Sequence, residues 1–263
     1  MRLEGKVAVV AGAGQTPGDT IGNGRATAIL FAREGASVLL VDRRRDSAAE
    51  TQEMIAAEGG TAIAFEADIT REDDCRAVAA GCVEEFGRID VLHNNVGIGA
   101  GDSGVTHLEL ESWQRIIDVN LTAMFLACKH VLPVMREQHS GAIVNISSLA
   151  SVAATGMAAY KVSKAGVNAL TQQIAMGNAR YGIRCNAILP GLMNTPMAIE
   201  SIAAARGIPK AQLIRERDAA VPLGGMGTAW DVAKAALFLA SDDASFITGA
   251  LLPVDGGQGA RVG

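Results

Sequence analysis

Tyr160 and Lys164 are the side chains in this sequence best placed to carry out proton transfer. They stand four residues apart in the stretch YKVSK, and residues at i and i+4 share one face of a helix. An ammonium group near a phenol favours the phenolate, so it lowers the phenol pKa from its usual value of about 10. Bringing that pKa near 7 takes about 4 kcal/mol of differential stabilisation. Such a phenol can protonate a carbonyl oxygen or deprotonate an alcohol.

Two hydroxyls and one amide upstream could assist this chemistry. Ser147 and Ser148 end the apolar run AIVNISS, and Asn120 in DVNL lies inside a helix-like segment where an amide is unfavourable. Each pattern alone is weak. Tyr and Lys four apart occur often by chance, the serines could simply form strand-end hydrogen bonds, and Asn120 could be a solvated polar position.

The stretch AGAGQTPGDTIGNGRA, residues 11–26, is the candidate for phosphate binding. It holds five glycines but completes neither G-x-G-x-x-G reading, because the first reaches Pro17 and the second reaches Thr27. Glycines allow positive φ and close approach of a ligand. A helix beginning near Asn23 or Gly24 would offer its N-terminus to a pyrophosphate. The alternative is a disordered loop without a ligand.

Asp42 gives this loop a second point of support. It ends the next apolar run, eighteen residues after Gly24. A carboxylate there can accept hydrogen bonds from a ribose diol and would repel a 2′-phosphate. Strand, glycine loop, helix, strand and acidic residue together predict a dinucleotide site.

Short β-branched runs alternate with longer helix-like segments throughout the chain. The runs are nearly continuous in apolar residues, as in strands buried on both faces. They are residues 6–11, 37–42, 61–67, 89–95, 142–147, 183–189 and 249–255. This rhythm predicts an α/β fold: a doubly wound parallel sheet of about seven strands with helices on both faces, in a single domain over residues 1–263. The least regular region, 192–226, suggests a loop or helical excursion over an active site, or an inert insertion.

Composition narrows the class of protein. The chain has 263 residues, 49% of them apolar, and a net charge of −5, which argues against disorder and against a general nucleic-acid binder. The four cysteines form no C-x-x-C pair and the four histidines show no ligand spacing, so we expect reduced thiols and no metal. We expect no membrane-spanning run and no signal peptide, and hence a cytoplasmic protein.

These motifs together resemble the short-chain dehydrogenase/reductase family, over nearly the whole chain from Lys6 to Gly257. Its reactive signature Y-x-x-x-K matches Tyr160 and Lys164. The resemblance implies that Ser148, with Ser147 as the fallback, positions the substrate oxygen. It also implies that Asn120 distorts its helix and anchors a water-mediated proton relay from Lys164 to solvent.

The resemblance extends to the cofactor. The family pattern G-x-x-x-G-x-G fits Gly12, Gly22 and Gly24 if Gln15–Ile21 carries about six extra residues that bulge outward, with Pro17 and Gly18 at the tip; Asp19 or Thr20 could cap an early helix. Ile188 and Thr195 would meet the nicotinamide carboxamide. The implied cofactor contacts are Gly12, Gly22, Asn23, Gly24, Asp42, Arg43, Asp68, Ile69, Asn95, Val96, Gly97, Tyr160, Lys164, Pro190, Gly191 and Thr195.

The sequence therefore predicts an NAD-dependent oxidoreductase that acts on a secondary alcohol or carbonyl in a homotetramer. Asp42 favours NAD, with Arg43 stacked on adenine and Arg44 and Arg45 in solvent. The substrate could be a sugar, a cyclic alcohol or a hydroxyacyl compound. Its contacts also stay open: apolar residues of the lid, residues 192–226, could line a pocket, or basic residues of the lid could attract an acidic group.

Two other functions stay open: a nucleotide-sensing protein without turnover and an NADPH-dependent 3-oxoacyl thioester reductase. An epimerase or dehydratase of the extended fold would need a longer C-terminal substrate domain than the roughly 70 residues after Pro190. The enoyl-reductase branch has an enlarged glycine loop but spaces its Tyr and Lys seven apart, which sets it aside.

Overall fold

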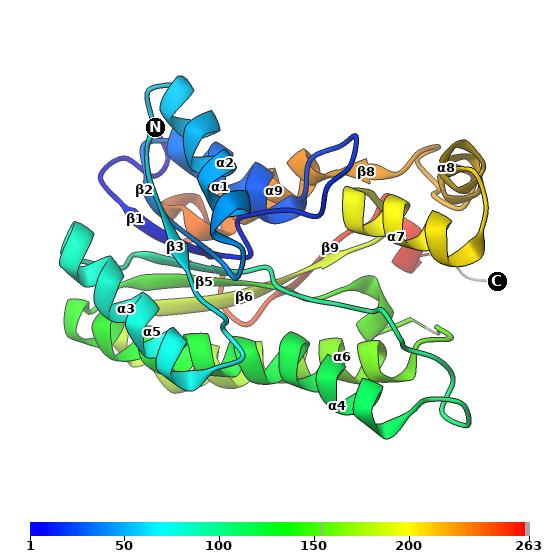
Figure 1. The fold of residues 1–263 in the computed structure, drawn as a ribbon. Coiled ribbons are helices and arrows are strands. Elements are labelled where there is room, and N and C mark those ends of the chain that lie inside the picture. Colours follow the sequence, from blue (N-terminus) through cyan, green and yellow to red (C-terminus); the bar gives the residue numbers. More distant parts are fainter. Residues whose placement is uncertain (154, 261–263) are drawn as a thin grey trace.

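The computed structural model describes residues 1–153 and 155–260, and its centre is one parallel sheet (Figure 1). Seven strands lie in the order β3-β2-β1-β4-β5-β6-β9, and every neighbouring pair is parallel. The strands are β1 (Val7–Ala11), β2 (Ser37–Asp42), β3 (Thr61–Glu66), β4 (Val91–Asn94), β5 (Gly141–Ile146), β6 (Ile183–Pro190) and β9 (Leu251–Val254). All seven predicted strands are confirmed to within two residues at either end, because buried parallel strands leave continuous apolar runs.

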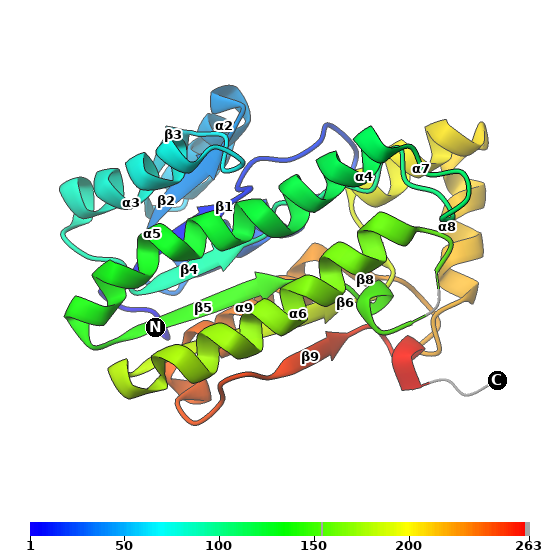
Figure 2. The same ribbon diagram turned by 90° about the horizontal axis from the view of Figure 1, so that it is seen from below.

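Helices cover both faces of the sheet (Figures 1 and 2). On one face lie α1 (Asn23–Arg33), α2 (Arg45–Ala57) and α9 (Ala229–Ala240); on the other lie α3 (Glu72–Phe86), α4 (Leu110–Ile117), α5 (Ala123–Gln138) and α6 (Ala158–Asn178). The predicted doubly wound α/β fold is therefore confirmed. Short helical turns are η1 (Asp118–Thr122), η2 (Leu149–Ser151), η3 (Ala179–Tyr181), η4 (Asp242–Ala244) and η5 (Gln258–Ala260).

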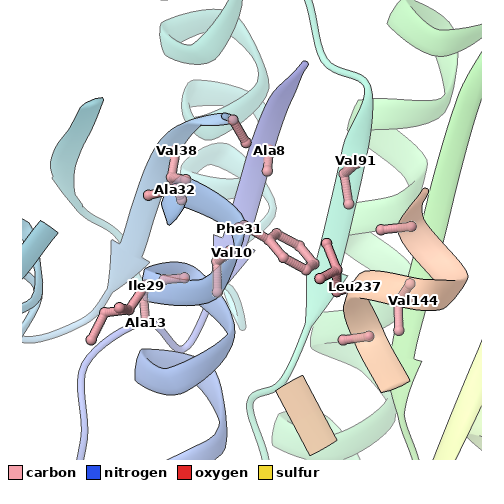
Figure 3. Close-up of a cluster of buried hydrophobic side chains, with 14 of the residues drawn as sticks. Ala8, Val10, Ala13, Ile29, Phe31, Ala32, Val38, Val91, Val144 and Leu237 are labelled. Carbon is pink, nitrogen blue, oxygen red and sulfur yellow. The ribbon is translucent and has the colours of Figure 1, made fainter. Parts of the chain in front are cut away.

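The core between the sheet and α1 and α9 is packed around Phe31. Its ring lies between the strands and Leu237 of α9, close to Val91 and Val144 (Figure 3). Phe31 is fully buried, and an aromatic side chain of that size removes a large apolar area from water. This core fixes α1, the helix whose N-terminus follows the glycine loop.

The strand order places polar residues together at one edge of the sheet. The chain passes outward from β1 to β3, then returns to β4 on the other side of β1. The crevice at such a reversal, beyond the carboxyl ends of the strands, is where ligands bind in open α/β sheets. Residues that follow β1, β4, β5 and β6 all reach this edge.

The continuous helix Leu110–Gln138 differs from one expectation. By length and mean hydropathy it could cross a membrane, although no such run was expected. One such helix is weak evidence, since the core helix of a soluble protein passes the same test. Here α5 packs against β4 and β5 through buried residues such as Met124 and Val131.

Residues 192–226 form a small unit beyond the sheet. It contains β7 (Met193–Asn194), α7 (Pro196–Arg206) and α8 (Lys210–Ala219), and β7 pairs with β8 (Gly227–Thr228). Ile199, Ala203 and Leu213 form its own core with Ile202. Among the apolar residues of this region that could have contacted a substrate, Ile199, Ile202 and Leu213 instead pack α7 against α8; we call residues 192–226 the α7–α8 unit.

Candidate functional site

Four polar residues predicted to act together are brought to the same edge of the sheet. Tyr160 and Lys164 lie on α6, Ser148 follows β5, and Asn120 lies in η1 between α4 and α5. Gly97, after β4, sits against them: a Cβ on it would lie 3.2 Å from Lys164 Nζ and 3.5 Å from Asn120 Oδ1. Only a residue without a side chain fits here without displacing the ammonium.

Lys164 and Tyr160 are neighbours with their polar ends in different environments. Lys164 is 2% exposed, and its Nζ donates to Ile146 O at 2.8 Å and lies 5.8 Å from the Tyr160 ring centroid. Burial lowers the pKa of Lys164 to about 8. Burial also raises the pKa of Tyr160, and a hydrogen bond with Ser148 opposes that rise.

The expected lowering of the Tyr160 pKa by Lys164 is therefore wrong for these residues by themselves. Burial raises the Tyr160 pKa by more than the Ser148 hydroxyl lowers it, and the Lys164 ammonium donates its hydrogen bond to the carbonyl oxygen of Ile146. The dominant effect is desolvation, which disfavours the charged form of both groups. The two hydroxyl groups, however, are brought within hydrogen-bonding reach.

Ser148 and Ser147 have different surroundings. Ser147 is buried and its hydroxyl donates to Lys164 O at 3.0 Å, so its hydrogen bond is directed to the helix backbone. Ser148 is half-buried, its hydroxyl lowers the pKa of the Tyr160 phenol, and it accepts a hydrogen bond from Ala150 N at 3.1 Å. Of the two serines, Ser148 is the one directed at the tyrosine.

Asn120 occupies a π-helical turn, which explains an amide inside a long helix. The prediction of a local helix distortion is confirmed, because Asp118–Thr122 is a π segment, a feature that often occurs at functional sites. Asn120 is fully buried; its Oδ1 accepts from Ile98 N at 2.7 Å, and its Nδ2 donates to Ile98 O at 2.9 Å and Ser163 Oγ at 3.1 Å. It thus fixes the segment after β4 against α6.

Sequence reasoning missed three residues that hold this group in place. Asp102 accepts hydrogen bonds from Ala159 N and Tyr160 N, and Ser151 donates to Ser148 O at 2.6 Å while accepting from Asn168 at 2.9 Å. A lone Asp in GIGAGDSG and a Ser or Asn on a helix follow no motif. Their roles depend on contacts between distant segments.

The glycine loop brings α1 against β1. Gly12 has φ +82°, and a Cβ on Gly24 would lie 1.9 Å from Gly12 O. Asn95 Nδ2 donates to Gly12 O at 3.2 Å. Gly12 and Gly24 thus permit the close helix–strand approach expected of them.

The extra residues of this loop bulge outward, as expected. At their base Gln15 Oε1 accepts from Gly22 N at 2.9 Å, while residues 16–19 are exposed. The helix begins at Asn23 with Gly22 before it and no side-chain cap. Neither Asp19 nor Thr20 caps it, because both lie on the bulge.

The tip of the bulge reaches the α7–α8 unit (Figure 1). A Cβ on Gly18 would lie 2.9 Å from both Pro196 Cβ and Glu200 Cγ. Lys210 Nζ lies 3.1 Å from Asp19 Oδ2 and 2.6 Å from Glu200 Oε2. The bulge therefore connects the glycine loop with residues 192–226.

Asp42 lies at the predicted position, at the end of β2 beside the glycine loop. Its Oδ2 accepts from Gly14 N and its Oδ1 from Arg44 N, each at 3.0 Å. Arg43, Arg44 and Arg45 are all exposed, and the Arg44 guanidinium also donates to Gln15 O and Ser47 Oγ. Arg44 therefore lies at the solvent-exposed surface and also fastens the loop to α2.

The remaining predicted residues follow β3, β4 and β6. Asp68 is half-buried and accepts two hydrogen bonds from Thr70, and Ile69 is 7% exposed. Val96 packs against Gly12, with its Cγ2 3.0 Å from the position of a Gly12 Cβ. Asn94 Nδ2 donates to Asn145 Oδ1 at 2.9 Å and so links β4 to β5.

At the end of β6, the side chain of Ile188 does not lie where a contact with the nicotinamide was expected. Gly191 N donates to Val254 O at 3.0 Å just after Pro190, and Thr195 is buried at the start of α7. Ile188 is fully buried in the core with Val144. Its side chain therefore cannot meet a nicotinamide, because it points into the packed core and not to the sheet edge.

Comparisons with known proteins agree with this geometry. A family model described as Enoyl-(Acyl carrier protein) reductase matches residues 19–258. The crystal structure of a short-chain dehydrogenase/reductase from Burkholderia xenovorans is 43% identical, covers 100% of this chain and 99% of its own, and superposes with a TM-score of 0.94.

Two curated relatives also match across nearly the whole chain. One is 3beta-hydroxysteroid dehydrogenase 1 of Eggerthella lenta, 39% identical over 97% of this chain and 94% of the relative. Another is a 3-oxoacyl-(acyl-carrier-protein) reductase of Thermotoga maritima, 37% identical over 98% of this chain and 99% of the relative.

Proposed function

The chain belongs to the short-chain dehydrogenase/reductase family, and we propose that it is an NAD-dependent dehydrogenase of uncharged secondary alcohols. Oxidoreductase action on a CH–OH group with a nicotinamide cofactor follows from that membership. The observation that carries the proposal is the group formed by Ser148, Tyr160 and Lys164 beside Gly97, at the sheet edge next to the glycine loop.

The residues at this edge fit a dinucleotide. Gly12 and Gly24 leave a backbone cradle that a Cβ would fill, and Asn23 Oδ1 is buried at the start of α1 without a hydrogen-bond partner among the described residues. The N-terminus of α1 would face the pyrophosphate. Gly22, Asp68, Ile69, Asn95, Val96, Gly97, Pro190, Gly191 and Thr195 are proposed to complete the contacts along the sheet edge.

The bound cofactor would supply a hydride acceptor at C4 of its nicotinamide ring. Tyr160 takes the proton of the substrate hydroxyl on its phenolate oxygen, the carbinol hydrogen leaves as hydride, and the C–O bond becomes a carbonyl. Ser148 donates to the substrate oxygen and holds it beside the phenol. In the reverse direction the phenol returns the proton to the carbonyl oxygen.

Lys164 and Asn120 serve the tyrosine in this scheme. The Lys164 ammonium would hold the nicotinamide ribose. Asn120, fixed between Ile98 and Ser163, anchors the water-mediated relay that returns the proton to solvent. Burial raises the Tyr160 pKa, and the positive charge of the oxidised ring would oppose that rise.

Asp42 supports NAD over NADP. Both of its oxygens already accept one backbone N–H, yet a carboxylate has further lone pairs for a ribose diol. The same charge repels a 2′-phosphate. Arg44 is engaged with the loop, which leaves Arg43 free to stack on adenine.

Two regions near the site, residues 148–160 and the α7–α8 unit, favour an uncharged substrate. Residues 148–160, which join Ser148 to Tyr160, contain no charged side chain. In the α7–α8 unit two of the four basic side chains form ion pairs, Arg206 with Glu216 and Lys210 with Asp19 and Glu200. The steroid relative acts on a cyclic alcohol, and a cyclic secondary alcohol is our first choice, with the α7–α8 unit as its lid.

One alternative has a specific observation behind it. The Thermotoga maritima relative is a 3-oxoacyl-(acyl-carrier-protein) reductase, so NADPH-dependent reduction of a 3-oxoacyl thioester is the second candidate. Both reactions use the same tyrosine and serine. They differ in cofactor and in the need for a cationic surface to receive an acyl carrier.

A substrate screen tests the proposal. Purified protein is mixed with NAD or NADP and a panel of cyclic alcohols, hydroxysteroids, sugars and hydroxyacyl thioesters, and absorbance at the reduced-cofactor band is followed. We expect NAD reduction with a cyclic alcohol and none in the Tyr160→Phe variant. Exclusive oxidation of NADPH by a 3-oxoacyl thioester would replace our proposal with the alternative.

Homotetramer formation and a cytoplasmic location stay predictions. Light scattering at micromolar concentration measures the first directly, with a mass of four chains of 27.2 kDa expected.

A further inference from the structure

We propose that Asp102 is a positioning residue for Tyr160: it ties the segment after β4 to the first turn of α6 and so sets where the phenol lies. The proposal rests on the proposed alcohol dehydrogenase function, in which that phenol transfers a proton. Among the described residues, the Asp102 carboxylate accepts hydrogen bonds from backbone N–H groups of α6 and of Ser103 only, so it acts through Tyr160.

The first amides of α6 are satisfied from a distant segment. Asp102 Oδ2 accepts from Tyr160 N at 2.6 Å and Oδ1 from Ala159 N at 3.1 Å, and Ser103 O accepts from Ala158 N at 3.1 Å. Met157, at the cap position, offers no side-chain hydrogen bond. The leading N–H groups of a helix have no partner within it, and here a residue 58 positions upstream of Tyr160 supplies one.

A carboxylate suits this task better than other side chains. Ala159 N and Ser103 N both donate to Asp102 Oδ1, and Tyr160 N donates to Oδ2, so both positions need an acceptor, which a carboxylate supplies. Its negative charge also interacts favourably with the positive end of the helix dipole. An amide of the same shape offers one acceptor, so it can serve one position and not both.

The segment that carries Asp102 is itself fixed at several points. Asn120 holds Ile98 through both backbone groups, Arg115 donates to Ala100 O at 2.6 Å, and Asp102 N donates to Gly99 O at 3.2 Å. A Cβ on Gly99 would lie 3.7 Å from Tyr160 Cδ2. The segment therefore passes beside the tyrosine ring and is anchored to the π turn that holds Asn120.

The consequence for catalysis follows from this geometry. Without Asp102 the first turn of α6 loses two hydrogen bonds at the residue that carries the phenol and its neighbour. The Tyr160 oxygen would then sample positions away from Ser148. Misplacement of a reacting group by about 1 Å can cost about 100-fold in rate.

The first test is kinetic. We expect Asp102→Ala to lower kcat for alcohol oxidation about 10- to 100-fold, with the affinity for NAD unchanged within about twofold, and Asp102→Asn to recover part of the loss. The deuterium isotope effect on kcat with carbinol-deuterated alcohol should rise, because hydride transfer becomes slower relative to product release. A loss of stability alone would not raise an isotope effect.

A matched control separates positioning from helix capping in general. Asp231 accepts from Thr228 N and Oγ1 at 2.8 Å each and caps α9. Asp231→Asn should lower the melting temperature by a similar amount to Asp102→Asn and leave kcat within about twofold, since losing a cap costs about 1 kcal/mol wherever it occurs. A fall in kcat of the same size in both variants would overturn the proposal.

A second measurement does not depend on any substrate. The chain has two tyrosines, Tyr160 and Tyr181, so protein labelled with carbon-13 in its tyrosine rings gives two sets of ring signals, assigned with Tyr160→Phe. In Asp102→Ala we expect the Tyr160 signal to shift or broaden and the Tyr181 signal to stay. An unmoved Tyr160 signal would reject Asp102 as its positioning residue, whether or not the wild-type protein oxidises an alcohol. A wild-type protein that oxidises no alcohol would count against the proposed function only.

Discussion

The catalytic group and the glycine-loop bulge are held in opposite ways. Around Tyr160, polar groups are buried: Lys164 is 2% exposed and Asn120 fully buried, each with a directed hydrogen bond. Where the bulge meets the α7–α8 unit, the side chains of Asp19 and Lys210 are 83% and 45% exposed. Buried polar groups must keep their partners or lose free energy, whereas exposed ion pairs are screened by water and salt.

The difference teaches which contacts fix geometry and which can yield. The hydrogen bonds of Asn120, Ser147 and Lys164 join separate strands and helices, so they define one arrangement of the site. The Lys210 bridge joins two surface segments, the glycine-loop bulge and the α7–α8 unit, through charges that are exposed to solvent. Changes at the first region should therefore alter chemistry, and changes at the second should alter binding slightly.

The two adjacent serines should separate chemistry from support, with the largest expected effect. Ser148→Ala removes the hydroxyl directed at Tyr160, and we expect kcat/KM to fall about 100- to 1000-fold, the usual loss for one donor to a reacting oxygen. Ser147→Ala should lower the melting temperature and reduce kcat/KM much less. Steady-state kinetics and thermal unfolding of both variants check this, and the reverse order would make Ser147 the substrate-binding serine.

Cofactor choice should respond to Asp42 with a smaller effect. Asp42→Ala removes the charge that repels a 2′-phosphate, so we expect the ratio of kcat/KM for NAD over NADP to fall about 10- to 100-fold, as expected for losing about two kcal/mol of discrimination. The ratio is measured with one alcohol and both cofactors. Arg45→Ala, which changes an exposed neighbouring residue, is the control, and a preference for NADP in the wild type would contradict the role of Asp42.

His93 shows that burial alone does not make a functional site. It is fully buried against Phe31, and neither ring nitrogen has a hydrogen-bond partner in the described part of the chain. Burial lowers its pKa to about 3, so between pH 3 and its unfolded value of about 6.5 the unfolded chain binds more protons. Because His93 gains a proton only when the chain unfolds, it should lower the free energy of unfolding by about 1.4 kcal/mol for each pH unit below 6.5.

Denaturant titrations from pH 7 to pH 4.5 measure that slope. We expect His93→Leu to be less sensitive to acid than the wild type, because it lacks the group that gains a proton on unfolding. His107→Gln, which changes an exposed histidine, should behave like the wild type. Equal acid sensitivity in His93→Leu and the wild type would show that His93 is not held neutral.

The Lys210 bridge should give the smallest effect. Lys210→Ala removes two exposed ion pairs, and we expect less than about a threefold change in KM for alcohol, diminishing as salt rises. Gly18→Leu, which places a side chain against Pro196 and Glu200, should change KM more than Lys210→Ala does. Steady-state assays at low and high salt compare them; a large, salt-independent loss of kcat in Lys210→Ala would place this bridge among the rigid parts of the site.

Much of the fold was predictable because apolar runs record burial directly. The runs at residues 37–42 and 183–189 predicted β2 and β6, since a strand that is covered on both faces carries apolar side chains on both. The β7–β8 pair escaped notice because two residues per strand leave no pattern. The core inside the α7–α8 unit also escaped, since Ile199 and Leu213 could face each other or a ligand equally well by sequence.

The candidate site was predictable where a residue's motif has a fixed spacing. Tyr160 and Lys164 lie on one helix, and the distortion at Asn120 is what the family resemblance implies. Asp102, Ser151 and Asn168 act across segments that only folding brings together, so no spacing reveals them. The direction of the Tyr160 pKa was wrong because desolvation depends on burial, which the spacing of two residues does not report.

One measurement tests the central claim most directly: single-turnover transfer of deuterium from a carbinol-deuterated cyclic alcohol to NAD, by wild-type protein and by Tyr160→Phe, with the reduced cofactor analysed by mass spectrometry. Our account predicts one deuterium per reduced cofactor in the wild type, and a rate at least about 1000-fold lower in the variant, which still binds NAD. Equal transfer rates in the two proteins would contradict the assignment of Tyr160 as the residue that moves the proton.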